Sequence, residues 1–165
     1  MTDMTKLVFM GGAPGVGKSS VARELLGRLD HCVWLDGDDL WRMHPFVVND
    51  TTTNMVEHNI QSVLRSFIQT GFPVVIFTWV LHDKSVADRL TQGVSDVPFQ
   101  FFMFTLTCDE ATLVSRLSLE TSRTTNTDLA LQRLRQTLAL DTLKIDTTRK
   151  GPRVVAEEIV KRLFA

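Results

Sequence analysis

The stretch Gly12-Ala13-Pro14-Gly15-Val16-Gly17-Lys18-Ser19 constrains the fold of this 165-residue chain more than any other feature. It matches the pattern G-x-x-x-x-G-K-[ST], whose glycines let backbone N–H groups turn inward around a phosphate. An apolar run at Leu7–Met10 precedes it, and a helix-like run at Ser20–Leu26 follows. A glycine-rich turn without a ligand is the alternative. Four matched positions between a strand and a helix argue against it.

This loop therefore predicts a nucleotide-phosphate site. Lys18 is expected to reach the β- and γ-phosphates, and the Ser19 hydroxyl to ligate Mg²⁺. The following helix would add the partial positive charge of its N-terminus. The expected phosphate contacts are Gly12, Ala13, Pro14, Gly15, Val16, Gly17, Lys18, Ser19 and Ser20.

The composition excludes several classes of partner. With 44% hydrophobic and 22% charged residues, the chain has enough apolar mass for a core. A net charge of −1 points to neither nucleic acid nor a membrane surface. We expect no membrane span and no signal peptide, and the two cysteines, Cys32 and Cys108, lack metal-ligand spacing. A cytoplasmic protein is the expectation.

Strand-like and helix-like segments alternate along the whole chain. This pattern predicts an α/β fold, a three-layer α/β/α sandwich around a five-stranded, mainly parallel sheet, in one domain spanning residues 1–165. The expected strands are Lys6–Met10, Cys32–Leu35, Val74–Trp79, Phe99–Leu106 and Leu143–Asp146. The expected helices are Lys18–Leu29, Thr53–Thr70, Asp83–Leu90, Glu110–Leu119, Leu129–Leu140 and Pro152–Phe164.

An acidic cluster, Asp36-Gly37-Asp38-Asp39, follows the second expected strand. Ligands of open α/β sheets bind at the carboxyl ends of strands, so this cluster should face the γ-phosphate. Asp38 is the candidate carboxylate that accepts a proton from an acceptor hydroxyl. Asp36, nearer the strand, is the candidate for holding a water on Mg²⁺. The alternative is an Asx-type turn in which Asp38 caps a short helix.

Together, Gly12-x-x-Gly15-x-Gly17-Lys18-Ser19 and Leu35-Asp36-Gly37-Asp38 resemble the P-loop small-molecule kinases: gluconate, adenylylsulfate and shikimate kinases and chloramphenicol phosphotransferase. The resemblance implies a P-loop NTPase fold of the nucleoside/shikimate-kinase type and ATP with Mg²⁺. It also implies transfer to a hydroxyl or phosphate of a small-molecule acceptor. By position, Asp38 matches the acceptor-contacting carboxylate, and Arg42 matches an arginine that faces the substrate in adenylylsulfate kinase.

The same resemblance implies a lid at about residues 119–128. Arg116 would stack on adenine opposite Pro152, and Arg123 in the lid would contact the transferring phosphate. A lid arginine stabilises the transition state, and its removal typically costs ~10³–10⁵ in rate. The alternative for Arg116 is a solvated helix residue. The alternative for the Pro152 loop is an ordinary strand-to-helix connection.

Three features depart from the kinase pattern. Thr78 ends the third strand where many P-loop proteins carry a Walker B aspartate, so metal support would come from Asp36, water and Asp83. Thr-Trp-Val replaces the glycine triplet of shikimate kinase, which argues against shikimate recognition. The lid contains a single arginine, whereas adenylate-kinase-like enzymes usually carry several.

The acceptor pocket is expected between residues 36–45, the helix near Thr53 and the turn 78–83. Its candidate walls are Trp41, Phe46, Trp79 and His82, and Trp79 is a candidate substrate-binding residue with core packing as its alternative. His44 and His82 lack the spacing of metal ligands.

The leading interpretation is an ATP-dependent small-molecule kinase, a monomer or homodimer without a nucleic-acid or membrane partner. A nucleoside or nucleotide kinase is the first alternative, and a kinase acting on an antibiotic or a sugar-nucleotide is a further variant. A regulatory module that binds ATP or GTP without transfer is the alternative from another class. The guanine-reading pattern Asn-Lys-x-Asp is absent. The sequence leaves the identity of the acceptor open.

Overall fold

The computed structural model describes residues 4–120 and 125–165. Its five strands form one sheet in the order β2-β3-β1-β4-β5, and every neighbouring pair is parallel. The strands are β1 (Thr5–Gly11), β2 (Cys32–Asp36), β3 (Val74–Thr78), β4 (Phe99–Thr107) and β5 (Leu143–Asp146). The predicted α/β fold with a parallel five-stranded sheet is therefore confirmed. Arg123 and part of the expected lid lie outside the described residues.

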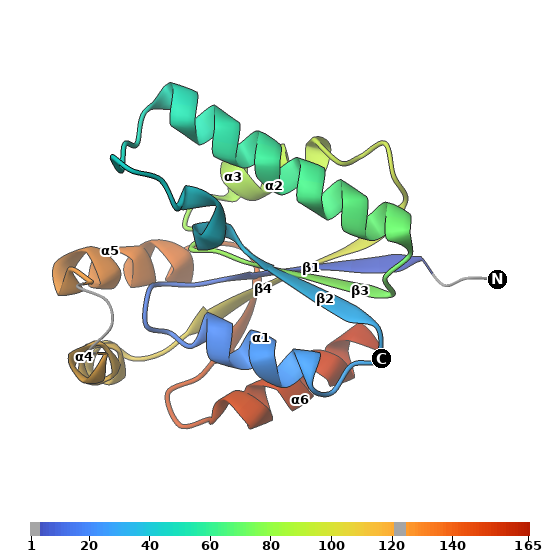
Figure 1. Ribbon diagram of the computed structural model, residues 1–165. Helices are drawn as coiled ribbons and strands as arrows, with labels where there is room; N and C mark the ends of the chain where they lie inside the picture. The colour runs from blue at the N-terminus through green and yellow to red at the C-terminus, as the bar shows by residue number, and fades with distance from the viewer. Residues whose placement is uncertain (1–3, 121–124) are drawn as a thin grey trace.

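Helices cover both faces of this sheet (Figure 1). Helices α2 and α3 lie on one face, and α1 and α6 lie on the other. The helices are α1 (Lys18–Leu26), α2 (Asp50–Thr70), α3 (Lys84–Gln92), α4 (Glu110–Leu119), α5 (Thr127–Leu138) and α6 (Pro152–Leu163). A short 3₁₀ helix, η1 (Gly37–Trp41), follows β2 directly.

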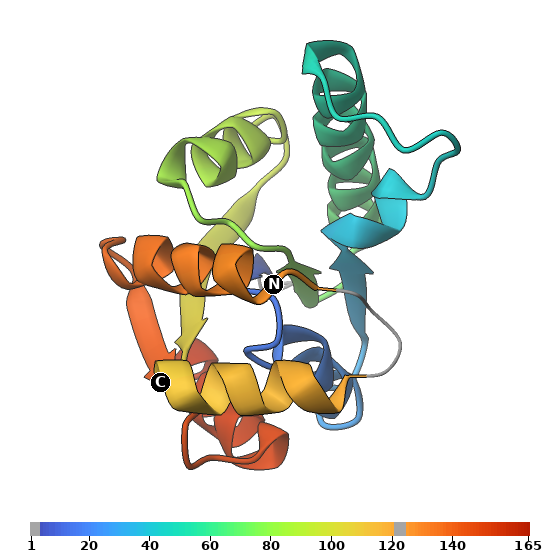
Figure 2. The ribbon, with the colours of Figure 1, turned by 90° about the vertical axis from the view of Figure 1, so that its left-hand side faces the viewer.

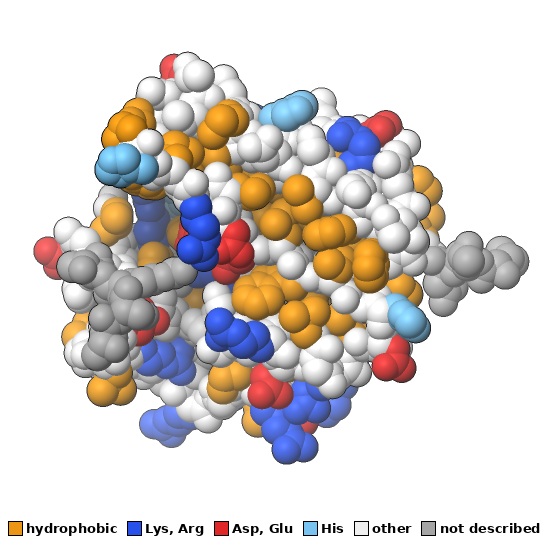
Figure 3. Space-filling view, viewed as in Figure 1, with side chains coloured by type: hydrophobic (Ala, Val, Ile, Leu, Met, Phe, Trp, Pro, Cys, Tyr) orange, Lys and Arg blue, Asp and Glu red, His pale blue; other side chains and the backbone are white. Residues whose placement is uncertain are grey.

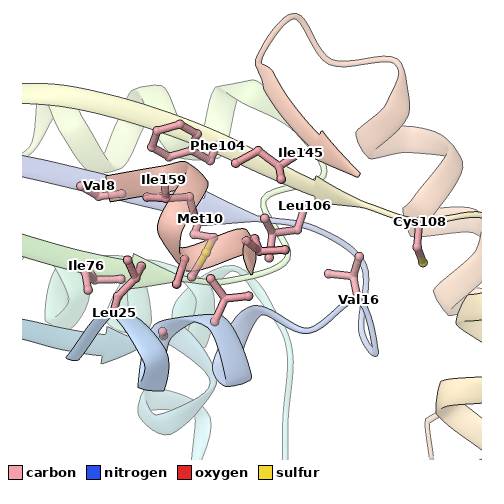
Figure 4. Packing of buried hydrophobic residues seen from close by; sticks show 14 of the residues in the cluster. Val8, Met10, Val16, Leu25, Ile76, Phe104, Leu106, Cys108, Ile145 and Ile159 are labelled. Atoms are coloured by element: carbon pink, nitrogen blue, oxygen red, sulfur yellow. The ribbon is translucent and has the colours of Figure 1, made fainter. Parts of the chain in front are cut away.

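The central strand β1 divides the hydrophobic core in two. Val8 and Met10 pack with residues of α1 and α6 (Figure 4), while Leu7 and Phe9 pack with residues of α2 and α3. Successive side chains of a strand point to opposite faces, and all four are fully buried. A wholly apolar strand is therefore needed here, as expected for a sheet covered on both sides.

Two helix boundaries differ from the prediction by three residues, and the other differences are of one or two residues. Helix α1 ends at Leu26 rather than Leu29, because Gly27 follows and glycine is a poor helix former. Helix α2 begins at Asp50 rather than Thr53, because Asn49 and Thr52 form a reciprocal capping box. The Asn49 side chain accepts from the Thr52 N–H at 2.9 Å, and the Thr52 hydroxyl accepts from the Asn49 N–H at 3.0 Å.

The acidic cluster after β2 forms a cap rather than an open loop. Oδ1 of Asp36 accepts a hydrogen bond from the backbone N–H of Asp38 at 3.0 Å, and Asp36 is the N-cap of η1. The expected alternative placed Asp38 at the cap, and the structure places Asp36 there. The Asp38 side chain is thereby left exposed beyond the end of the sheet.

Figure 2 views the carboxyl edge of the sheet, where η1, the N-terminus of α1 and α4 come together. Within residues 4–120 and 125–165, none of the helices combines the length and apolarity required to cross a lipid bilayer.

Candidate nucleotide and acceptor site

A cavity of about 390 Å³ lies at the carboxyl edge of the sheet. Segments far apart in the sequence line it: the glycine-rich loop, the end of β2, α4 and the loop before α6. Its described lining residues are Pro14, Gly15, Val16, Gly17, Lys18, Ser19, Ser20, Val21, Asp36, Asp38, Val80, Arg116, Glu120, Thr125, Thr147, Lys150, Gly151, Pro152 and Val155. The fold thus gathers most of the residues expected to contact nucleotide and metal around one space.

The glycine-rich loop requires glycine at two positions for steric as well as conformational reasons. Gly12 has φ +147°, and a Cβ there would lie 2.7 Å from the carbonyl oxygen of Leu106. Gly15 has φ +84°, and its Cβ would lie 2.7 Å from Cδ2 of Leu117. The loop therefore packs closely against β4 and α4.

Lys18 contacts the loop from which it projects. Its ammonium donates hydrogen bonds to the carbonyl oxygens of Gly12 at 2.8 Å and Ala13 at 3.0 Å. Ala13 is fully buried. Of the nine expected phosphate contacts, Gly12 and Ala13 are the two that are not among the described residues that line the cavity.

The N-terminus of α1 opens toward the same cavity. Its N-cap is Gly17, at φ +108°, which has no side chain to cap the helix, and the first turn contains no acidic residue. In contrast, α2, α3, α4 and α5 each begin with a side-chain cap. The first-turn N–H groups of α1 thus keep the partial positive charge that attracts anions.

Ser19 and Asp36, the expected metal pair, lie next to one another. The Ser19 hydroxyl donates to Oδ2 of Asp36 at 3.2 Å. A hydroxyl and a carboxylate are oxygen donors of the kind that Mg²⁺ prefers. Among the described residues, no group of three or more His, Cys, Asp or Glu could hold a metal. This donor set fits a Mg²⁺ that keeps phosphate oxygens and waters as its other ligands.

Thr78, at the place of a Walker B aspartate, has a structural contact instead. It is fully buried, and its hydroxyl accepts a hydrogen bond from Nε1 of Trp34 at 2.8 Å. Asp83 caps α3, accepting from the N–H of Ser85 at 2.9 Å, and this hydrogen bonding lowers the pKa of Asp83. Asp83 is not among the described residues that line the cavity.

Arg116 joins the glycine-rich loop to the segment after β5. Its Nη1 donates to the carbonyl of Val16 at 3.1 Å and to Oγ1 of Thr147 at 2.9 Å, while Nη2 donates to the Thr147 carbonyl at 2.7 Å. Arg116 is therefore not a solvated surface residue. Thr147 is buried and also donates to the carbonyl of Thr107 at 3.0 Å. Sequence reasoning missed Thr147, because one threonine in a polar loop carries no pattern.

Lys150 lines the cavity, as does Pro152, which occupies the first turn of α6. The Lys150 ammonium donates to Oε2 of Glu158 at 2.8 Å. This hydrogen bond is the main reason why the pKa of Glu158 is lowered, and Arg162 adds to the effect. The salt bridge attaches the loop before α6 to α6 itself, which fixes the wall expected to border a base.

A second cavity, of about 380 Å³, adjoins the first. Its described lining residues are Asp38, Trp41, Arg42, Phe46 and Val48. Among the described residues, Asp38 is the one that lines both cavities. Basic and acidic side chains adjoin around the hollow at the left of the space-filling view, and hydrophobic side chains extend beside it over β2 (Figure 3).

Arg42 lies at this second cavity and is held by a neighbour on η1. Its Nη2 and Nε donate to Oδ1 of Asp39 at 2.7 and 3.2 Å. The Asp39 carboxylate thereby raises the pKa of Arg42 above its ordinary value. Arg42 is well exposed, so the pair fixes the direction of its side chain more than it adds stability.

Trp79 and His82 are not among the described residues that line either cavity. Trp79 is half-buried against the core, its ring centroid 6.3 Å from that of Phe77, and it touches Gly37, where a Cβ would lie 2.7 Å from the indole. Trp79 therefore packs against the core, which is the alternative given for it from the sequence. His82 is partly buried, and burial together with the charge of Arg133 lowers its pKa.

Comparison with solved structures identifies the class of fold. It is that of the P-loop kinases, as the motif predicted. The chain is similar to the tunicamycin resistance protein of Deinococcus radiodurans, at 23% identity and a TM-score of 0.74, over 96% of this chain and 95% of that one. It is also similar to a sugar kinase from Janibacter sp. (16% identity, TM-score 0.73, 98% of this chain and 95% of that one). A third similar structure is the APS kinase of Mycobacterium tuberculosis (14% identity, TM-score 0.65, 98% of this chain and 99% of that one).

The chain itself belongs to the AAA domain family, whose family model matches residues 8–134. This match includes the glycine-rich loop, the acidic turn after β2 and Arg116. No curated protein matches the sequence.

Proposed function

We propose that this protein is an ATP-dependent phosphotransferase that moves the γ-phosphoryl group of Mg-ATP to a small-molecule acceptor. The observation that most directly supports this proposal is the position of Asp38, which lines both adjoining cavities. One cavity has the glycine-rich loop of a phosphate site, and the other is open to solvent beside it. A carboxylate shared by two such spaces is suited to meet an acceptor hydroxyl at the transferring phosphate.

In this proposal the donor phosphates lie at the N-terminus of α1. The backbone N–H groups and the Lys18 ammonium offset the charge of the β- and γ-phosphates. Ser19 and Asp36 would hold Mg²⁺, directly or through water. When bound, the ion neutralises phosphate charge and orients the β- and γ-oxygens.

Asp38 acts on the acceptor. Its carboxylate would accept a hydrogen bond from the hydroxyl, orient the oxygen toward the γ-phosphorus and take the proton. The new P–O bond to the acceptor would form as the bond from the γ-phosphorus to the β,γ-bridging oxygen breaks and ADP leaves. Because η1 is capped by Asp36, the carboxylate that supports the metal and the one that meets the acceptor are held two residues apart in a fixed turn.

The base of the nucleotide would lie between Arg116 and Pro152. The hydrogen bonds of Arg116 to Val16 and Thr147 support this role, because they hold the guanidinium at the cavity wall. Arg123, outside the described residues, is proposed from its place in the sequence as the lid arginine that contacts the transferring phosphate.

The comparisons support a small-molecule acceptor. The APS kinase of the comparison was solved with AMPPNP and APS, an ATP analogue and a small acceptor together. The other two similar structures are named for a sugar kinase and for resistance to tunicamycin. These names span sugars and an antibiotic, so they favour small acceptors as a class.

A nucleotide-binding module without transfer is the second candidate. It is favoured by Thr78, which stands in the place of a metal-supporting aspartate and is occupied by its hydrogen bond to Trp34. A module of this kind would bind Mg-ATP and show no dependence on Asp38.

The test is acceptor-dependent ADP formation by wild type, Lys18→Met and Asp38→Asn. Lys18→Met should abolish turnover. Asp38→Asn should lower it by roughly 10²–10⁴-fold, the usual contribution of a general base. Asp88→Asn, the same change on an exposed residue of α3, is the matched control and should match wild type. Equal turnover by Asp38→Asn and wild type would reject the transfer mechanism.

A further inference from the structure

We propose that the acceptor joins a planar unsaturated ring to a hydroxyl-bearing arm, which is the chemistry of a nucleoside. This inference rests on the proposed function and concerns the second cavity. The hydroxyl would meet Asp38, and the ring would lie on the aromatic wall formed by Trp41 and Phe46.

Three of the five described residues that line this cavity are apolar, and the cavity is open to solvent. Phe46 is 66% exposed and Val48 is 64% exposed, although both line a cavity that reaches Asp38. Exposed apolar side chains grouped beside a candidate catalytic carboxylate gain free energy when a ligand covers them. An acceptor with an apolar surface would provide that cover.

Trp41 and Phe46 pack against one another as a tilted aromatic pair. The centroids of Trp41 and Phe46 are 6.1 Å apart, and their planes are tilted by 56°. Trp41 packs against the core beneath α2, so it offers a fixed surface, while Phe46 lies outside the core. A planar ring stacked on one of them would meet the other at its edge, which is a favoured aromatic geometry.

The polar side chains of the cavity are few. Among its described lining residues only Asp38 and Arg42 are charged, and Trp41 adds one indole N–H. A polyol would bury several hydroxyls against these walls, and each hydroxyl without a partner would oppose binding. A nucleoside keeps its hydroxyls on one arm and offers the ring to the apolar wall.

Arg42 adds a contact suited to the edge of a heterocycle. Its hydrogen bonds to Asp39 run from Nε and Nη2, and a guanidinium has five N–H donors in all. The remaining donors suit a ring carbonyl or ring nitrogen. A plain hydrocarbon ring offers no such acceptor, so the pair of Arg42 and the aromatic wall favours a heterocycle.

The experiment measures binding and turnover separately with four probes. Uridine and adenosine supply a heterocycle and a hydroxyl, benzyl alcohol supplies a plain ring and a hydroxyl, and gluconate supplies hydroxyls without a ring. Calorimetry with AMPPNP present gives the affinity of each probe, and ADP formation from Mg-ATP gives turnover. Binding is compared between wild type and three variants, Phe46→Ala, Phe46→Leu and Val47→Ala, and Asp38→Asn is added for turnover alone. Val47 is 39% exposed and is not among the described residues that line the cavity, so it is the matched control.

We expect a nucleoside to bind more tightly than gluconate or benzyl alcohol. Phe46→Ala should weaken that binding about tenfold, in the range of base–aromatic stacking, and Val47→Ala should leave it unchanged. Phe46→Leu, which keeps an apolar side chain without a ring, should recover only part of the loss. The melting temperatures of the three variants check that the fold is retained.

Preferred binding of gluconate, or nucleoside binding that Phe46→Ala leaves intact, would overturn the inference. Benzyl alcohol binding as tightly as the nucleosides would reject a heterocycle. If gluconate supports Asp38-dependent ADP formation and nucleosides do not bind, phosphotransfer stands and the ring inference fails. If nucleosides bind through Phe46 and none supports ADP formation, the ring inference stands and the proposed function fails.

Discussion

The Ser19 hydroxyl donates a hydrogen bond to Oδ2 of Asp36 across 3.2 Å, which joins the first turn of α1 to the end of the edge strand β2. The other oxygen of the same carboxylate caps η1. One side chain thus connects the loop expected to hold phosphates with the turn that presents Asp38. Changes at Asp36 should therefore affect both the proposed metal site and the turn that presents Asp38.

Asp36→Asn should raise the Mg²⁺ concentration needed for half-maximal ADP formation about tenfold or more, because supporting ligands contribute 10–100-fold to metal affinity. Asparagine keeps an oxygen that can accept from the Asp38 N–H, so the melting temperature should change little. A Mg²⁺ titration of turnover is the measurement. Asp88→Asn is the control, and a Mg²⁺ dependence unchanged from wild type in Asp36→Asn would remove Asp36 from the metal site.

Thr147→Val should weaken nucleotide binding about fivefold and reduce the free energy of unfolding by about 1 kcal/mol, the usual net value of a hydrogen bond. The substitution removes the hydroxyl that joins Arg116 to the Thr107 carbonyl, while that carbonyl keeps the Thr147 N–H and Nη1 of Arg116 keeps the Val16 carbonyl. Calorimetry with AMPPNP and urea unfolding measure the two effects. Thr70→Val, on an exposed position of α2, should change the stability by less than about 0.5 kcal/mol. Full nucleotide affinity in Thr147→Val would contradict the positioning role of the pair.

Gly12→Ala should destabilise the fold by about 3 kcal/mol or more, because the new Cβ meets both a positive φ and the Leu106 carbonyl. Gly71→Ala is the matched control. Gly71 has φ +88°, and a Cβ there would meet no atom within 4 Å, so its substitution should cost only about 1–2 kcal/mol of backbone strain. Urea unfolding of both variants measures the difference. Equal losses would show that the contact with β4 relaxes without cost.

The ion pairs of Glu158 should make the free energy of unfolding decrease at acidic pH. Lys150 and Arg162 lower the pKa of Glu158 in the folded protein below that of an unfolded glutamate, which is about 4.3. The folded state therefore binds protons less readily, so the stabilisation is complete above that pH and is lost as the pH falls through the lowered pKa. The pair is partly solvated, and its contribution should be about 0.5 kcal/mol.

The corresponding measurement is urea unfolding of wild type and Glu158→Gln between pH 3 and 7. The stability difference should be largest at pH 7 and should shrink toward pH 3. Lys150→Met should lose most of the same pH-dependent component, because its ammonium is the main cause of the shift. A difference between wild type and Glu158→Gln that is constant with pH would contradict this assignment.

The fold could be predicted from sequence because its strands are short apolar runs and its helices begin and end at recognisable residues. Gly71 stopped α2 as expected, and the central strand read as buried on both faces. Asn49 was missed, because its cap is formed with Thr52 inside a long polar stretch in which many residues could cap. The short helix after β2 is anticipated as the alternative for this segment, but with Asp38 as its cap instead of Asp36, because the two carboxylates are chemically equivalent caps and only geometry distinguishes them.

The site could be predicted only where motif spacing fixes position. The glycine-rich loop, Asp36, Asp38 and Arg116 surround one cavity, but their catalytic roles stay predictions. Thr147 gave no sequence signal, since its value lies in contacts to three segments distant in the chain. Trp79 has a sequence signal, but an ambiguous one, because an aromatic residue at a strand end suits a pocket or the core equally. In the structure it contacts Gly37 and packs against the core.

The sheet order carries a consequence for how acceptors could diversify on this scaffold. Met10, Thr78 and Asp36 lie in one row across β1, β3 and β2. The sheet therefore fixes the distance between the end of β1 and the Asp36 backbone at two strand spacings, about 10 Å. Residues 42–49 connect η1 to α2 and are not part of this row of paired residues. We therefore expect substitutions in residues 42–49 to change which acceptor binds without moving Asp36 relative to the glycine-rich loop.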